Sequence, residues 1–195
     1  MPKPNNKWRF CIDYRALNAA TPSNLGWLLP NIPHLLQRLG NAKSDHFGVF
    51  DLTSGYFQAA LHKNSRELSA FICCVGLFQW LRVAMGLKGA PHYFQQQMVS
   101  VVLVGLIYYI CEVYLDDIIV HGKGEDEFCH RVSLILERAI QKNITFNPTK
   151  CRLGLDRIDY LGHVIDSEGI SFNTDKISKV VEFPTPTNAK QPDHS

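Results

Sequence analysis

The sequence predicts an α+β fold in which helices pack on one face of a mostly antiparallel sheet. Three observations lead to this prediction. Apolar patterns indicate elements in the order helix, strand, hairpin, helix, two strands, helix and strand. No glycine-rich fingerprint of a dinucleotide-binding sheet is present. The chain has 195 residues, of which 46% are hydrophobic, and this is enough for one sizeable core.

The first expected elements lie between residues 32 and 55. Apolar residues recur at helical spacing before Gly40, which predicts a short helix with one inward face formed by Ile32, Leu35, Leu36 and Leu39. In residues 46–52 the apolar side chains alternate between two sides, which predicts a strand that ends near Asp51. Residues 53–55 then predict a turn, because they read Thr-Ser-Gly.

The middle of the chain predicts a hairpin followed by a helix. Residues 71–82 are rich in β-formers on either side of Gly76. Residues 86–89 contain two glycines and predict a flexible loop. Pro91 stands where a helix begins, and the expected helix runs towards Leu103.

The last third of the chain predicts two strands, a long helix and a further strand. Residues 107–120 are rich in β-formers and are interrupted only by Asp116 and Asp117. A strongly amphipathic helix is expected over residues 127–143, with the apolar positions Phe128, Val132, Ile135, Leu136, Ala139 and Ile140. Residues 160–165 predict a strand, and three prolines after it indicate a loose tail: Pro184, Pro186 and Pro192.

The charge is spread unevenly. The formal net charge of +2 is too small to indicate a nucleic-acid partner. Residues 1–18, however, carry a local charge of +3, because only Asp13 opposes four basic residues: Lys3, Lys7, Arg9 and Arg15. A basic arm of this kind can meet phosphates, and an ordinary solvated N-terminus is the alternative.

The N-terminus is polar where a signal peptide would be apolar, so the protein is expected to stay inside the cell, in the cytoplasm. The longest apolar stretch, residues 101–111, is shorter than the roughly 18 to 20 residues that span a bilayer, and no membrane segment is predicted. The six cysteines form no C-x-x-C pair and lie mostly in apolar runs, which predicts buried free thiols and no zinc site.

Two adjacent acids stand in the apolar run of residues 107–120, within Tyr114-Leu115-Asp116-Asp117. A buried unpaired carboxylate is costly, so this position calls for an explanation. Neighbouring side chains on a strand point to opposite faces, so both acids reach one site only if the chain turns there, as at a hairpin tip. An ordinary polar turn between two core strands is the alternative reading.

Asp51 also ends an apolar strand, and a sheet can bring it beside Asp116 and Asp117. Three convergent acids repel one another unless cations neutralise them. Two Mg²⁺ ions about 3.5 to 4 Å apart would do so and would clamp the oxygens of an in-line phosphoryl transfer. A transposase-type acid triad would need a downstream glutamate, but that neighbourhood holds Lys150, Cys151 and Arg152.

Six short blocks stand in order along the chain: residues 8–18 (WRFCIDYRALN), 50–56 (FDLTSGY), 86–91 (GLKGAP), 114–120 (YLDDIIV), 147–151 (NPTKC) and 160–165 (YLGHVI). Any one block is weak, but the ordered set is specific. On these blocks, the chain resembles the reverse transcriptases of gypsy-type LTR retrotransposons from about Lys3 to about Gln191. The departures are Trp27-Leu28-Leu29-Pro30 in place of Tyr-Pro-Leu-Pro, and Ala84-Met85 in place of a proline-containing pair.

The resemblance implies a polymerase palm with a fingers subdomain, and roles for individual residues. Asp51, Asp116 and Asp117 would hold two Mg²⁺ or Mn²⁺ ions, with Asp117 aimed mainly at the primer terminus. Arg9, and less directly Lys3, would contact the phosphates of the incoming nucleotide. A surface charge beside Trp8 is the alternative for Arg9.

The resemblance also implies a nucleotide pocket. Tyr56 would be the steric gate against a 2′-hydroxyl, with an ordinary core tyrosine as the alternative. The backbone amides of Leu52, Thr53, Ser54 and Gly55 would bind triphosphate oxygens. Met85 and Gly86 would lie in the loop beside the pocket.

Two further positions lie after the long helix. Leu161, Gly162 and His163 match the primer grip, although a purely structural role is the alternative for His163. Lys150 is a weaker candidate for the general acid that protonates the departing pyrophosphate, because that role needs a lowered pKa. An exposed lysine with no catalytic role is the alternative.

The implied function is RNA-directed DNA polymerase, adding deoxynucleotides to a primer 3′-hydroxyl. We expect fingers over residues 1–26 and 59–89, palm over residues 27–58 and 90–172, and the truncated start of a thumb over residues 173–195.

The expected partners are an RNA or DNA template, a DNA or tRNA primer and deoxynucleoside triphosphates. Neighbouring polyprotein domains such as ribonuclease H and integrase are also expected, and an intact element would place the protein in a virus-like particle. The alternatives are a catalytically silent nucleic-acid-binding remnant and a palm-like nucleotide cyclase, against which residues 160–165 argue.

Overall fold

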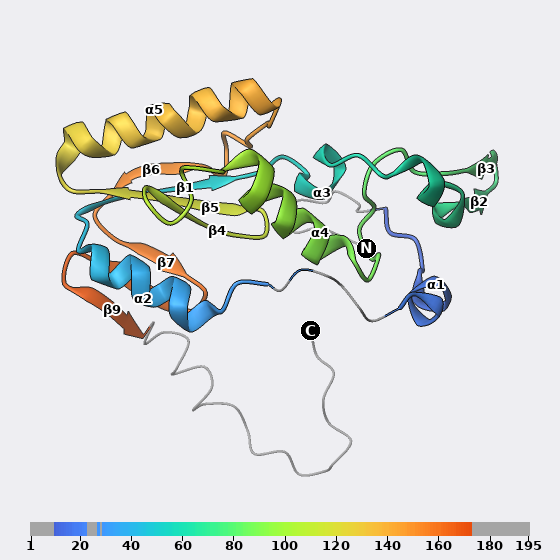
Figure 1. Cartoon of the computed structure of the whole chain (residues 1–195), viewed down its shortest axis with the longest axis horizontal. Coiled ribbons are helices and arrows are strands. Elements are labelled where there is room, and N and C mark those ends of the chain that lie inside the picture. Colours follow the sequence, from blue (N-terminus) through green and yellow to red (C-terminus); the bar gives the residue numbers. More distant parts are fainter. Residues whose placement is uncertain (1–9, 23–26, 28, 173–195) are drawn as a thin grey trace, which may run out of the picture.

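Figure 1 shows the computed structural model of the chain, which describes residues 10–22, 27 and 29–172. The helices are α1 (Arg15–Ala20), α2 (Ile32–Ala42), α3 (Gly55–Gln58), α4 (Ala90–Gln97) and α5 (Gly124–Lys142), with short 3-10 turns at Lys63–Ser65 and Glu67–Ser69 and a π-helix at Met98–Val102. The strands are β1 (His46–Asp51), β2 (Phe71–Cys73), β3 (Gly76–Phe78), β4 (Cys111–Tyr114), β5 (Asp117–Gly122), β6 (Arg152–Leu155), β7 (Ile158–Tyr160), β8 (His163–Asp166) and β9 (Gly169–Phe172).

The central sheet has four strands in the order β4-β5-β1-β6, and all its strand pairs are antiparallel. A separate sheet, β7-β8-β9, and the hairpin β2-β3 are antiparallel as well. The predicted α+β class and mostly antiparallel sheet are therefore confirmed.

Alternating side chains of β1 separate two cores, as the sequence predicts. Phe50 belongs to the core that α4 and α5 build on one face of the central sheet, together with Phe94 and Phe128. Phe47 and Val49 belong to the core on the other face, which α2 and the sheet β7-β8-β9 cover. Helices α4 and α5 thus share one face as expected, whereas α2 lies on the opposite face, so the helices are not confined to a single side (Figure 1).

Several predicted boundaries are wrong. Residues 107–110 do not continue a strand: Gly105 at φ +80° and Tyr108 at φ +71° turn the chain before β4. The helix expected from Pro91 to Leu103 is α4 followed by the π-helix. The strand expected over residues 160–165 is the end of β7, a tight turn and β8. The hairpin β2-β3 is shorter than expected, because its turn begins directly after Cys73.

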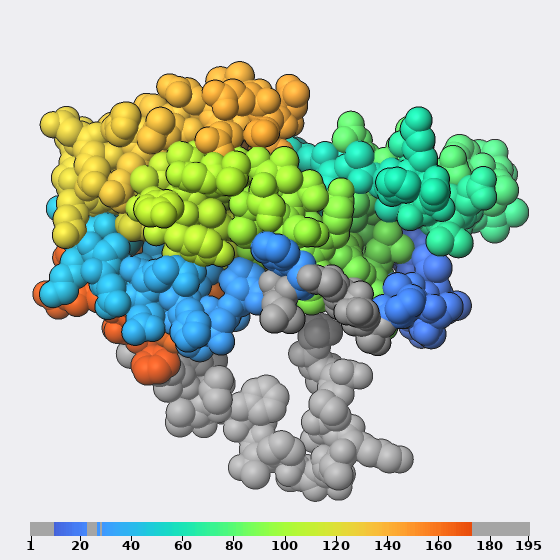
Figure 2. All heavy atoms as spheres, viewed as in Figure 1, coloured from blue at the N-terminus to red at the C-terminus, as the bar shows by residue number. Residues whose placement is uncertain are grey.

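The hairpin β2-β3 lies at one end of the molecule, far from α5 and α2 (Figures 1 and 2). Its outward side chains are strongly exposed, and Ile72 and Leu77 keep 81% and 73% of their surface accessible. Phe71 and Trp80 form an aromatic cluster with Phe10 beneath it. The hairpin thus rests on this small cluster and contributes to neither of the two large cores.

No helix in the described part of the chain is long and apolar enough to cross a membrane. All six cysteines are free thiols, as expected. The prediction that they are buried is wrong for most of them, since Cys11, Cys73, Cys74 and Cys129 are exposed. Only Cys111 is fully buried, and burial raises the pKa of its thiol to about 12.

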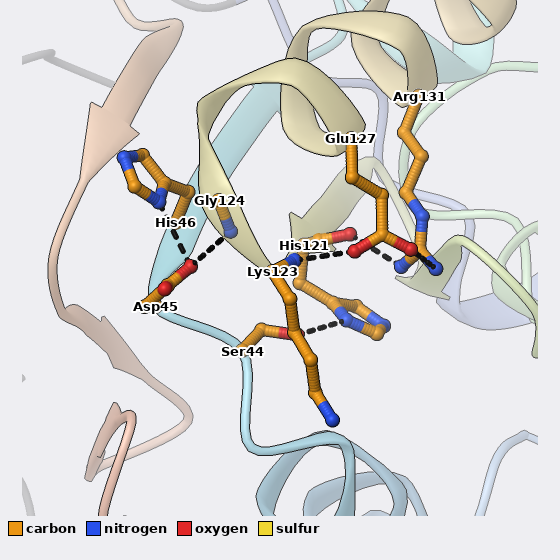
Figure 3. A network of polar contacts seen from close by, with 8 residues as sticks. All are labelled: Ser44, Asp45, His46, His121, Lys123, Gly124, Glu127 and Arg131. Carbon is orange, nitrogen blue, oxygen red and sulfur yellow. Dashed lines mark hydrogen bonds and ion pairs between the residues drawn. The ribbon is translucent and has the colours of Figure 1, made fainter.

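A polar network closes the end of the sheet opposite the carboxylates (Figure 3). The side chain of Asp45 accepts a hydrogen bond from the first amide of α5, at Gly124, over 2.7 Å. Ser44 Oγ lies 2.9 Å from Nδ1 of buried His121, whose carbonyl accepts a bond from Arg131 at 2.7 Å. The network ties the start of α5 to the ends of β1 and β5.

We expect His121 to make the fold sensitive to acid. Burial, followed by the charge of Arg131, lowers the pKa of His121 to about 4, while nearby Glu127 acts in the opposite direction. As the pH falls, the imidazole of the unfolded chain therefore takes up a proton before that of the folded protein does. The free energy of unfolding consequently decreases by a few kcal/mol between about pH 6.5 and about pH 4. Replacing His121 with glutamine should flatten this decline in thermal melts. The same change at exposed His130 should leave the decline as it is.

Candidate active site

The two acids of the apolar run lie at a hairpin tip, as the sequence predicts. Strands β4 and β5 pair from Tyr114 to Asp117, so Leu115 and Asp116 form a two-residue loop. Leu115 has a φ of +56°, which primed hairpin turns require at their first central position. The turn is what allows Asp116 and Asp117 to serve one site.

Asp51 is the last residue of β1, and its direct partner across the sheet is Asp117. The amide of Leu52 donates to the carbonyl of Asp116 over 3.3 Å. Gly55 lies so close that a Cβ there would stand 3.2 Å from the Cβ of Asp116, which explains the need for glycine at the start of α3. The structure therefore brings the three predicted acids together from two strands and one turn.

The carboxylates repel one another. Burial raises the pKa of Asp117, and the charges of Asp116 and Asp51 raise it further. Lys150 offsets part of this repulsion, because its Nζ donates to Oδ2 of Asp51 over 2.9 Å. The three carboxylates therefore create a negative electrostatic potential, which the exposed ammonium group of Lys150 partly neutralises.

This donor set suits a divalent metal ion. Carboxylate oxygens are the ligands that Mg²⁺ prefers, and proteins usually supply only one or two of them, leaving the other positions to water and substrate phosphates. Within the described residues, however, no three acidic, histidine or cysteine side chains are arranged so that they could hold a metal ion as they stand. The repulsion on Asp117 is the feature that a bound cation would relieve.

Lys150 and a metal ion would compete for Asp51. Replacing Lys150 with methionine should strengthen Mn²⁺ binding by about two- to fivefold, since an exposed ion pair of up to about 1 kcal/mol no longer has to be broken. Titration followed by electron paramagnetic resonance measures this affinity directly. The matched control is Lys123→Met, because Lys123 follows the opposite end of β5. Equal Mn²⁺ affinity in wild type and Lys150→Met would contradict the expectation.

The interaction of Lys150 with Asp51 also bears on its predicted role as general acid. The hydrogen bond to Asp51 is the largest cause of a raised pKa for Lys150, and a general acid needs the opposite direction. In the arrangement seen here, Lys150 holds its proton and neutralises Asp51.

Tyr56 lies beside the acids. Its ring packs against Phe94 of α4 with centroids 5.2 Å apart, and it is half-buried. Burial raises the pKa of Tyr56, and the charge of Asp116 adds to the effect, so the two side chains share one environment. Tyr56 therefore lies near Asp116, and its role as a gate over the nucleotide sugar stays a prediction.

The predicted phosphate-binding turn is only partly available. The amide of Leu52 is bonded to Asp116, and the amide of Thr53 donates to the carbonyl of Thr145 over 2.9 Å. The expectation that all four amides bind phosphate is therefore not met by this arrangement. Ser54, in the left-handed region at φ +52°, and Gly55 begin α3 and leave their amides as the remaining candidates.

The loop with Met85 and Gly86 is held by Asn18. Asn18 donates from Nδ2 to the carbonyl of Gly86 over 2.8 Å and accepts from the amide of Lys88 over 2.8 Å. Gly86 has a φ of +91°, which favours glycine. The loop is thus fixed to Asn18, the last residue of the predicted basic arm. Lys3 and Arg9 themselves lie outside the described residues.

The predicted primer grip forms the tight turn between β7 and β8. Leu161 and Gly162 both have positive φ values, +49° and +85°, and Tyr160 pairs with His163 across the turn. Leu161 and Tyr114 both pack on the core that contains Tyr160. The charge of Asp117 is the largest charge effect on the pKa of Tyr160, which burial raises. The turn therefore lies on the same face of the central sheet as Asp51 and Asp117. Nδ1 of His163 lies 3.1 Å from the carbonyl oxygen of Leu161, and its ring is tilted against that of Phe172.

Sequence reasoning missed three glutamine and asparagine side chains that hold these loops. Asn18 fixes the loop at Gly86, Gln58 bridges the carbonyls of Thr53 and Thr145 at 2.8 Å each, and Gln95 lies beneath the acidic hairpin. Only Gln95 could have been noticed in the sequence, because it is a polar residue between Phe94 and Met98 on the apolar face of a helix. A polar residue in such a place indicates a buried hydrogen bond.

Several known proteins resemble this chain in sequence. Residues 1–165 match the family described as "Reverse transcriptase (RNA-dependent DNA polymerase)". The chain is 33% identical over 192 residues to the retrovirus-related Pol polyprotein from transposon opus of Drosophila melanogaster, covering 97% of this chain and 19% of the relative. It is 32% identical over 182 residues to the Pol polyprotein from transposon gypsy of the same organism, covering 93% and 17%. The chain thus spans about a fifth of the curated relatives that it matches.

Solved structures resemble the fold. A foamy viral protease-reverse transcriptase in complex with dsDNA has a TM-score of 0.82 at 23% identity, covering 95% of this chain and 38% of that chain. A foamy viral protease-reverse transcriptase in complex with an RNA/DNA hybrid has a TM-score of 0.79 at 23% identity, covering 95% of this chain and 24% of that chain. The predicted resemblance is confirmed by the family match over residues 1–165, and the chain belongs to the reverse transcriptase family.

Proposed function

We propose that this chain is the polymerase core of a retroelement reverse transcriptase, which adds deoxynucleotides to a primer 3′-hydroxyl as an RNA-directed DNA polymerase. The observation that carries the proposal is the pairing of Asp51 with Asp117 across adjacent strands, with Asp116 in the turn beside them. Family membership over residues 1–165 supports it.

Asp51, Asp116 and Asp117 would hold two Mg²⁺ or Mn²⁺ ions. When bound, the two ions supply charge stabilisation for the attacking and leaving oxygens of an in-line phosphoryl transfer. The protein then contributes position: β1 and β5 fix Asp51 and Asp117 face to face, and the turn fixes Asp116. As the family resemblance implies, Asp117 would be aimed mainly at the primer terminus.

The nucleotide would lie over α3. Tyr56 would face the sugar, and the amides of Ser54 and Gly55 would face the triphosphate, because the amides of Leu52 and Thr53 are already bonded. The loop at Met85 and Gly86 would border the pocket. Arg9 and Lys3 would reach the phosphates from the N-terminal arm.

The turn at Leu161, Gly162 and His163 would hold the primer end, and its packing next to Tyr114 supports this. Lys150 would leave Asp51 when metal binds, and only then would it be free to protonate the pyrophosphate. The raised pKa seen here belongs to the ion pair with Asp51.

The lobes follow from the same proposal. Residues 1–26 and 59–89 would belong to the fingers, which include the projecting hairpin β2-β3, and residues 27–58 and 90–172 would form the palm. Residues 173–195, which lie outside the described residues, would begin a thumb. An RNA or DNA template, a primer and the remainder of a retrotransposon polyprotein would be the partners, as the Pol relatives suggest.

Primer extension tests the proposal. The purified chain, with a primed RNA template, deoxynucleotides and Mg²⁺ or Mn²⁺, should lengthen the primer, and Asp51→Asn should not. Extension that persists at the wild-type level in Asp51→Asn would contradict the proposed role of Asp51. If the wild-type chain binds the primed template but never extends it, the proposed polymerase activity is wrong and the chain is a silent binding remnant.

A further inference from the structure

Gln95 is a fully buried polar side chain, with 0% of its surface exposed. It lies on α4, and both ends of its carboxamide bond to the acidic hairpin. Nε2 donates to the carbonyl of Val113 over 3.2 Å, and Oε1 accepts from the amide of Leu115 over 2.7 Å. Only one orientation of the amide satisfies both partners, because one partner is an acceptor and the other is a donor.

These bonds complete the open side of the sheet. Strand β4 is the edge strand of the order β4-β5-β1-β6, so its outward backbone groups have no neighbouring strand. The carboxamide of Gln95 takes the place of a peptide group there, pairing with Val113 and Leu115 as a strand would. The buried carbonyl and amide are thereby satisfied, and leaving them unpaired would be costly.

The bonded amide belongs to the residue that bears the backbone strain. Leu115 has a φ of +56°, a left-handed conformation that is unfavourable for a non-glycine residue. Such a conformation persists where its surroundings hold it. The hydrogen bond from the Leu115 amide to Gln95 stabilises this conformation from the side of α4. The pairing of Tyr114 with Asp117 stabilises it from the side of β5.

We propose that Gln95 is a positioning residue of the polymerase site: it locks the strained turn at Leu115 so that Asp116 and Asp117 present their carboxylates to metal. The inference rests on the proposed function of the three acids. Gln95 itself touches neither Asp116 nor Asp117 by a hydrogen bond of its side chain; it acts through the backbone of the turn.

The test replaces Gln95 with methionine, which keeps the length of the side chain and removes both hydrogen bonds. Gln97→Met is the matched control, since it makes the same change two residues along the same helix at a half-buried position. Three quantities are measured: Mn²⁺ affinity by electron paramagnetic resonance, hydrogen exchange of the Leu115 amide, and kcat and KM for a deoxynucleotide.

For Gln95→Met we expect faster exchange at Leu115, Mn²⁺ binding weakened by about tenfold or more, and kcat lowered by about 10- to 100-fold, as for residues that orient metal ligands. The KM for the nucleotide should change little, and Gln97→Met should match wild type. A purely structural role would lower the melting temperature without changing Mn²⁺ affinity or kcat of the folded fraction, and that result would overturn the proposal.

Two further comparisons decide the case in which Gln95→Met does not fold and the case in which the wild type is inactive. If Gln95→Met does not fold, an ester in place of the Leu115 amide, introduced as the α-hydroxy analogue of leucine, removes one donor and leaves every side chain intact. Unchanged Mn²⁺ affinity in the ester variant would refute the inference. If wild type binds Mn²⁺ but does not extend primers, the proposed function fails by itself, whereas the Mn²⁺ comparison still judges Gln95.

Discussion

Replacing Asp116 with asparagine is expected to lower primer extension by about a thousandfold or more, a loss typical of residues that stabilise developing charge. The fold should remain, because the contacts that place this residue do not use its charge. Its carbonyl accepts from Leu52, and its Cβ packs against Gly55, and both contacts persist with asparagine. A gel-based extension assay and a thermal melt of the same preparation measure the two effects.

The partner variant Asp117→Asn should also be inactive and should be more stable than wild type in EDTA. The raised pKa of Asp117 means that the folded protein gains stability from the protonated form and loses it as the pH rises above the unfolded value of 3.8. Asparagine removes that loss, so the difference in melting temperature should grow with pH, by about 2 to 4 °C for each kcal/mol. A variant that melts below wild type at neutral pH, or that extends primers normally, would contradict the assignment.

Replacing Tyr56 with alanine is expected to lower the preference for deoxynucleotides over ribonucleotides by about 10- to 100-fold. An apolar pocket discriminates against one added hydroxyl group by roughly this factor, and the discrimination is lost when the wall that excludes the group is removed. The ring packs on Phe94 and lies near enough to Asp116 to feel its charge, which is compatible with this role. The ratio of kcat/KM for matched ribo- and deoxynucleotides measures the effect.

Tyr56→Phe is the matched control, because it keeps the ring and removes only the hydroxyl. It should retain the selectivity of wild type. Tyr56→Ala also deletes a half-buried ring and will cost stability, so activity must be compared at a temperature where both variants are folded. An active Tyr56→Ala with unchanged selectivity would return Tyr56 to an ordinary packing role.

The acidic constellation could be predicted from sequence because its signal is local. Asp116 and Asp117 interrupt an apolar run, Asp51 ends another, and antiparallel strands bring such positions together. The two faces of β1 were likewise predictable from alternation. The resemblance to reverse transcriptases then implied roles for individual residues, which hydrophobic periodicity alone cannot indicate.

The supports of the site could not be predicted, because they join residues far apart in the chain. Gln95 bonds a backbone 20 residues away, and Lys150 bonds Asp51 across 99 residues. Nothing in the composition around either residue encodes such a contact. The turns at Tyr108 and Leu161 were missed for a different reason: β-forming side chains there have positive φ values, so tertiary context overrides their local preference.

The register of β1 against β5 limits how this part of the gene can vary. Six residues of β1 pair one to one with β5, from His46 opposite Gly122 to Asp51 opposite Asp117. Because side chains alternate between faces, inserting or deleting a single codon between Phe47 and Asp51 would exchange the two cores and turn the carboxylate of Asp51 away from its partner. Length changes are therefore expected to accumulate in the projecting hairpin, which contacts neither core, and to be absent from β1.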